Sequence, residues 1–202
     1  MNPALTRKEE TRQRILESAS RLFLQKGVDG VGVDEIMREA GLTHGGFYVH
    51  FPNKEALVSE VCLCALDKSV SQWEDVTRRL GEDGFFRQFL AKYLSGDLRS
   101  DNPACPMAIL GPDVSRRSEP LQTAYAAKLR ELIDIVGQEM DSDRRMAIVT
   151  LAALVGATSL ATQVVQDKAL AEEILNTTRE ELLKCRPAKK RAPAKVKAEV
   201  VA

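Results

Sequence analysis

Apolar residues recur with helical spacing along most of the chain. In the first such segment, Ile15, Ala19, Leu22 and Phe23 fall at positions i, i+4, i+7 and i+8, which places them on one face of a helix. Gly27 follows this segment directly, and a glycine after the last turn is a common end of a helix. The pattern therefore predicts an amphipathic first helix that ends at Gly27.

Two short helices are predicted next. The first covers residues 33–40, with Gly32 as its N-cap and Gly41 as its end, and the second covers residues 44–49 with Thr43 as its N-cap. Two helices joined by a short turn that contains glycine form the helix-turn-helix pattern.

The rest of the chain is predicted to be helical as well, so the fold class is all-α. A fourth helix, capped by Asn53, extends to residue 79. Further helices are expected at residues 84–94, 107–116, 120–139, 142–166 and 169–184. Residues 186–202 are rich in Lys, Ala and Pro without apolar periodicity, and a disordered tail is expected there.

Composition and charge exclude some classes of protein. Hydrophobic residues make up 44% and charged residues 29% of the 202 residues, which allows a packed core. The formal net charge is zero, so the chain is not a uniformly basic nucleic-acid coat. Its charges are unevenly spread, because residues 56–183 carry 14 basic and 20 acidic residues whereas residues 184–202 carry seven basic residues and one acid. This basic tail either adds non-specific phosphate affinity or only keeps the chain soluble.

A cytoplasmic protein without a membrane segment is expected. The first ten residues are polar, which argues against a secretory signal. The most apolar stretch, residues 147–157, corresponds to about half a bilayer span. The four cysteines form no CxxC pair, which argues against structural zinc and for reduced thiols.

Residues 41–54 carry the candidate binding chemistry. They contain no acid, although the chain has 29. The free N–H groups after Thr43 form a possible anion site, and Tyr48, His50 and Lys54 offer donors for phosphate. The alternative is a polar surface turn with Phe47 and Phe51 in the core, because short helix-turn-helix patterns also occur outside DNA binding.

Residues 12–60 resemble the DNA-binding domain of the tetracycline-repressor-like (TetR) family of bacterial regulators. The matching residues are Arg14-Ile-Leu-Glu-Ser-Ala, Leu22-Phe23 before Gly27, Ile36, Ala40-Gly41-Leu42-Thr43, and Phe47-Tyr48-x-His50-Phe51-x-Asn53-Lys54-Glu55-x-Leu57. The resemblance implies a homodimeric transcriptional repressor that binds a palindromic operator in double-stranded DNA and responds to a small-molecule effector. It also implies a helix-turn-helix domain at residues 1–55 and a helical effector-binding and dimerisation domain at residues 56–185.

The family's DNA contacts map onto specific positions of this chain. Thr43, His44, Gly45 and Gly46 match the front of the recognition helix, Tyr48, His50 and Lys54 match phosphate contacts, and Thr11 or Arg12 matches a backbone contact from the first helix. Many members carry Lys where His44 stands and Ser or Thr where Gly46 stands. Because the two glycines remove side chains that read bases, closer approach and more shape readout are expected. His44 is either a DNA contact or a solvent-exposed first residue of the helix.

The predicted helix at residues 142–166 is apolar nearly all round, and the helix after it offers Leu170, Leu175 and Leu182. A helix without a polar face is buried on more than one side. It packs either against a two-fold copy, where the family dimerises, or at the centre of a monomer. A two-fold dimer would set its recognition helices roughly 34–36 Å apart.

An effector site is expected among the middle helices. Its candidates are polar or aromatic residues on apolar stretches, which are otherwise ordinary core residues: Trp73, Phe86, Phe89, Tyr93, Met107, Tyr125 and Thr158. Such a lining suits an apolar or aromatic molecule. Cys105 is a further candidate, because it precedes Pro106 at the start of a predicted helix, where the helix dipole favours a thiolate. It is either a redox- or electrophile-sensing thiol or a small buried cap.

Catalysis is not expected. The only two histidines, His44 and His50, lie in the proposed recognition segment, and the sequence shows neither a carboxylate–histidine metal cluster nor a glycine-rich nucleotide loop. No cofactor or metal is therefore predicted. A non-specific architectural DNA-binding protein that uses the basic tail is the remaining alternative.

Overall fold

The computed structural model describes residues 6–95, 106–139, 143–164 and 166–185, and every regular element in these ranges is helical. The elements are α1 (Arg7–Lys26), α2 (Val33–Glu39), η1 (His44–Val49), α3 (Lys54–Tyr93), α4 (Pro106–Val114), α5 (Glu119–Glu139), α6 (Arg144–Gln163) and α7 (Lys168–Lys184). The all-α prediction is confirmed. The predicted tail at residues 186–202 lies outside the described residues.

Local sequence explains where α1 begins and ends. Thr6 accepts a hydrogen bond from the backbone of Glu9, and the Glu9 side chain accepts one from the backbone of Thr6, which is a reciprocal capping box. At the other end Gly27 adopts φ +72°, a conformation that glycine reaches without strain. The predicted end at Gly27 is therefore confirmed.

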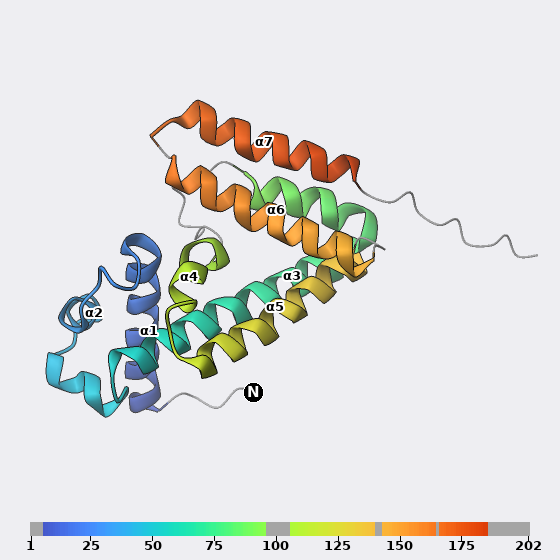
Figure 1. Ribbon diagram of the computed structural model, residues 1–202. Helices are drawn as coiled ribbons and strands as arrows, with labels where there is room; N and C mark the ends of the chain where they lie inside the picture. Colours follow the sequence, from blue (N-terminus) through green and yellow to red (C-terminus); the bar gives the residue numbers. More distant parts are fainter. Residues whose placement is uncertain (1–5, 96–105, 140–142, 165, 186–202) are drawn as a thin grey trace, which may run out of the picture.

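Helix α3 doubles back on itself. Its backbone is helical from Lys54 to Tyr93, yet the rings of Trp73 and Phe89 lie 4.6 Å apart. In a straight helix, residues this far apart in sequence would be separated by about 24 Å. The two helices predicted at residues 53–79 and 84–94 thus correspond to two limbs of α3, drawn in teal and green (Figure 1).

The described residues form two hydrophobic cores. One joins α1, α2, η1 and the first limb of α3, and it also includes Leu110, Val114 and Leu121 from α4 and α5. The other joins the rest of α3 with α5, α6 and α7 and includes Met107 and Ala108 from α4. We term residues 6–55 the head and residues 56–185 the body. In Figure 1, α4 lies between the head and helices α6 and α7.

Helix α6 is longer than the apolar stretch that the sequence suggested. By length and composition alone, this helix of 20 residues could cross a membrane. The estimate of half a span covered only residues 147–157 and so does not describe the whole helix. The core helix of a soluble protein meets the same criterion, and 39% of the most apolar part of α6 is buried against the rest of the chain. Its inward face packs on α5 and α7.

Candidate nucleic-acid interface

The tip of the head is η1, a 3₁₀ helix of six residues. Thr43 occupies the N-cap position, but its side chain makes no capping hydrogen bond, so the predicted hydroxyl cap is wrong. Instead the N–H of Gly46 donates to the carbonyl of Thr43 at 3.0 Å, which closes the tighter i to i+3 turn of a 3₁₀ helix. Two adjacent glycines disfavour an α-helix at this site.

Buried phenylalanines hold one face of η1 in the core, and the opposite face is exposed to solvent. Phe47 and Phe51 are fully buried, and their rings stack with centroids 5.7 Å apart. By contrast, Tyr48 and Val49 are 60% and 64% exposed. The expectation that the two phenylalanines belong to the core is confirmed, and the same anchoring presents an outward face.

Packing does not require glycine at this tip. A Cβ added to Gly45 would meet no atom within 4 Å, and one added to Gly46 would lie 3.6 Å from the Met37 side chain, an ordinary contact. Neither residue adopts positive φ; among the described glycines only Gly27 and Gly41 do. The fold therefore does not require glycine at residues 45 and 46.

His44 is exposed but has a partner. Its Nδ1 donates to the carboxylate of Asp34 on α2, and its ring contacts Tyr48 edge to face at 5.8 Å between centroids. Asp34 lies in the first turn of α2, and the sequence did not predict its pair with His44. The contact places Asp34 beside the first residue of η1.

Two predicted contacts on α1 are engaged within the protein. Arg12 donates through both terminal nitrogens to Glu60 on α3, and its guanidinium lies 4.6 Å from the Phe51 ring centroid. The hydrogen bonds that Arg12 donates to Glu60 raise the pKa of Arg12. The hydroxyl of Thr11 donates to the carbonyl of Arg7 at 2.8 Å. In this structure Arg12 fastens α1 to α3.

Lys54 and His50 are held differently from Tyr48. The ammonium of Lys54 donates to the carbonyl of Val28 at 2.8 Å, so it supports the connection between α1 and α2. His50 is half-buried, and its Nδ1 is buried without a hydrogen-bond partner among the described residues. Burial, together with the positive charges of Lys8 and Arg12, lowers the pKa of His50, which favours a neutral imidazole at pH 7.

Most candidate effector residues gather in the body. Trp73, Phe89, Met107 and Thr158 are buried, and Tyr93 and Tyr125 pack against the same core. The rings of Trp73, Phe89 and Tyr93 form one cluster, with centroid distances of 4.6, 5.4 and 6.0 Å. The side chain of Phe86 and the whole of Cys105 lie outside the described residues.

Helices α6 and α7 leave large apolar side chains on the surface. Ile148, Val149 and Leu160 on α6 are 45%, 56% and 53% exposed, and Leu170 on α7 is 40% exposed. The opposite side of α6 packs into the body core through Leu151 and Leu154, among others. The helix therefore has apolar residues on both its inward and its outward faces, as the sequence pattern suggested.

The described residues offer no metal-binding cluster, and the buried Cys62 is not a reactive thiol. No three His, Cys, Asp or Glu side chains converge there in a way that could hold a metal ion. Burial raises the pKa of Cys62 to about 11, so its thiol stays protonated and unreactive.

The comparisons with known proteins point to one family. Residues 15–61, from α1 into α3, match the family model described as bacterial regulatory proteins, tetR family. The transcriptional regulator AcrR of Shigella flexneri is 31% identical over 141 residues, covering 70% of this chain. The matched part spans only about half, 54%, of that regulator's length.

Solved structures share the fold. The reduced form of NemR from E. coli superimposes with a TM-score of 0.73 at 22% identity, covering 89% of this chain and 100% of that one. A TetR transcriptional regulator from Legionella pneumophila gives 0.74 at 20% identity, covering 93% and 100%. At such identities these similarities concern the fold alone.

Proposed function

The chain belongs to the tetR family of bacterial regulatory proteins, and on that premise we propose that it is a homodimeric repressor released from its operator by a small molecule. The observation that carries the proposal is the outward face of η1. Thr43, His44, Gly45 and Tyr48 are all exposed there, on an element that buried phenylalanines hold rigidly in the head. This face enters the major groove, and the two glycines let the backbone approach the DNA closely.

The flanking residues hold the phosphates on either side. Tyr48 donates its hydroxyl, and the ammonium of Lys54 has two N–H groups left after its bond to Val28. His50 adds an imidazole at the end of η1. Arg12 and Thr11 complete the contact from α1. For this, one of the two hydrogen bonds from Arg12 to Glu60 must be replaced by a bond to a phosphate oxygen.

The dimer forms through the exposed apolar residues of α6 and α7, in particular Val149, Leu160 and Leu170. A two-fold axis there brings the same patch of both copies together and removes these side chains from water. In this proposal residues 1–55 read DNA, and residues 56–185 dimerise and bind the effector.

The effector is an apolar or aromatic small molecule bound within the body, near the cluster of Trp73, Phe89 and Tyr93 and near Met107, Tyr125 and Thr158. An effector that binds better when the two heads are in a non-binding arrangement weakens DNA binding. Because the two equilibria are linked, DNA weakens effector binding by the same factor. The redox alternative rests on Cys105, outside the described residues, and is not part of the proposal.

Selection of genomic fragments with the purified full chain, followed by footprinting and light scattering, tests the proposal. A dimer that protects one short palindrome is expected. Protection spread evenly over any duplex would favour the architectural alternative. A monomer that ignores every duplex at low ionic strength would refute the proposal.

A further inference from the structure

The connection between α1 and α2, residues 27–32, packs against the body. Val28 in this connection is fully buried and shares a hydrophobic core with Leu110, Val114 and Leu121 of α4 and α5. The connection leads directly into α2, which packs on η1. Whatever fixes residues 27–32 therefore also restrains the reading face.

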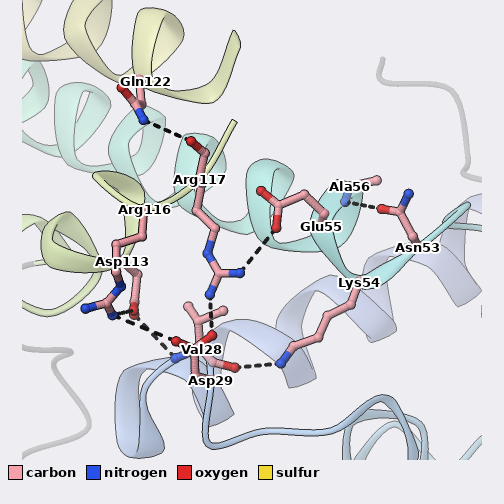
Figure 2. A network of polar contacts seen from close by, with 10 residues as sticks. All are labelled: Val28, Asp29, Asn53, Lys54, Glu55, Ala56, Asp113, Arg116, Arg117 and Gln122. Atoms are coloured by element: carbon pink, nitrogen blue, oxygen red, sulfur yellow. Dashed lines mark hydrogen bonds and ion pairs between the residues drawn. The ribbon is translucent and has the colours of Figure 1, made fainter. Parts of the chain in front are cut away.

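Both polar backbone atoms of Val28 are held by side chains (Figure 2). A carboxylate oxygen of Asp113, a residue of α4 that is 7% exposed, accepts from the N–H of Val28 at 3.4 Å. The other oxygen of Asp113 accepts from Arg116 at 2.8 Å. Lys54 holds the carbonyl of Val28 from the start of α3. The peptide groups around Val28 thus lie between α4 and α3.

The guanidinium of Arg117 links the segment just before α5 to the connection between α1 and α2 and to the start of α3. One terminal nitrogen donates to Asp29 at 2.5 Å and the other to Glu55 at 3.3 Å, and its side chain is only 18% exposed. The backbone carbonyl of Arg117 accepts from Gln122 on α5 at 2.9 Å, so the residue itself is anchored to the body. Figure 2 shows the guanidinium between Asp29 and Glu55.

This arrangement differs from an ordinary surface ion pair. Exposed pairs contribute little to stability, but a largely buried charge that loses its partner is costly. A second arrangement is available, because Nε of Arg117 and Oε1 of Glu55 are buried without hydrogen-bond partners among the described residues. Should Asp29 move away, the guanidinium can turn to pair with both oxygens of Glu55.

We propose that Arg117, assisted by Asp113, is a positioning residue for DNA binding, which holds residues 27–32 and thereby the head in the orientation that the operator requires. This inference rests on the proposed function and adds a polar route by which the body controls the head. Helix α4 contacts α1, α3 and α6, so a molecule that displaces α4 or the start of α5 also displaces Asp113 and Arg117. Release of Asp29 then frees the head.

The test compares Arg117→Gln with Arg144→Gln in the full chain. Arg144 pairs with a single aspartate, Asp134, and both side chains are about half exposed; this pair links α6 to α5, away from the head. Hydrogen exchange of the backbone at residues 27–32 and operator affinity are measured for both. Arg117→Gln is expected to speed exchange in this connection and to weaken operator binding roughly tenfold, whereas Arg144→Gln changes neither.

Two more variants separate positioning from folding. Asp29→Asn removes the exposed partner, which also lies 3.8 Å from Arg116, and is expected to reproduce the loss. The double variant with Arg117→Gln is expected to lose less than the sum of the two single changes, because both of them remove the Arg117–Asp29 contact. Arg117→Lys keeps the positive charge but lacks the paired N–H donors of the guanidinium. It is expected to recover part of the operator affinity that Arg117→Gln loses. If Arg117→Gln fails to fold, Asp29→Asn alone carries the test.

Wild-type exchange and affinity in Arg117→Gln, or in Asp29→Asn where the first does not fold, would overturn the inference and leave the proposed function standing. A wild-type chain that binds no operator would instead refute the proposed function. The exchange measurement would still show whether Arg117 restrains residues 27–32.

Discussion

Replacing Gly45 by alanine separates a requirement of the fold from a requirement of DNA binding. The added methyl group meets no atom within 4 Å, and the backbone is not in the positive-φ region. Alanine therefore fits the folded chain and restricts the unfolded one. A gain of about 0.4–1 kcal/mol in the free energy of unfolding is expected. For a chain of this length that corresponds to a rise in Tm of about 1–4 °C.

The same methyl group lies on the exposed face that we place against DNA. There it keeps the backbone of η1 away from the groove, at a cost comparable to one mismatched base pair, about 1–3 kcal/mol. Operator affinity is thus expected to fall about 5- to 150-fold while Tm rises. Thermal unfolding and fluorescence anisotropy with labelled operator measure the two quantities on one sample.

Because Tm is expected to rise while operator affinity falls, the variant controls for a general loss of folding. Wild-type affinity in Gly45→Ala would show that DNA does not approach this face closely. A fall in both Tm and affinity would show that the glycine serves the fold, contrary to the packing described above.

Three further predictions concern other residues. Lys54→Ala should weaken binding to all sequences alike and reduce the salt slope by about 1; an unchanged slope would remove Lys54 from the phosphate contacts. Because the folded pKa of His50 lies below its ordinary value of 6.5, the unfolded chain binds more protons there, so the free energy of unfolding should fall as the pH drops from 7 to 5.5. Denaturant titrations should show a smaller fall in His50→Gln, and an identical one would contradict the assignment. Leu160→Asp should give a folded monomer in light scattering with greatly reduced operator affinity; a dimer of normal affinity would place the interface elsewhere.

Local spacing predicted the helices well but not their exact form. Apolar periodicity and terminal glycines located α1 and α2, and the predicted break between residues 79 and 84 lies between Trp73 and Phe89, where α3 reverses. The same periodicity predicted a capped helix at residues 44–49, where the structure instead has a 3₁₀ helix without a side-chain cap. Periodicity shows which residues share a face, whereas the type of turn depends on the backbone preference of each residue.

Contacts between distant residues could not be predicted. Arg117 and Asp29 are 88 positions apart, and a sequence with 29 acids offers Arg117 many other partners. Lys54 illustrates the same limit, because its charge suggested phosphate while the fold also brings it to the Val28 carbonyl. The His44–Asp34 pair was missed because Asp34 already had a sufficient explanation as an acid at a helix start.

The shared core of α1, α4 and α5 limits where the head can be separated from the body. Leu110, Val114 and Leu121 complete the packing around α1 and α2, so a fragment cut at residue 55 would expose apolar surface and lose its solubility. If the head reads DNA as proposed, transfer of its specificity to another sensor requires that α4 and the first turn of α5 be transferred with it. Chimeras joined at the apparent domain boundary would then fail from misfolding, however well the recognition element was chosen.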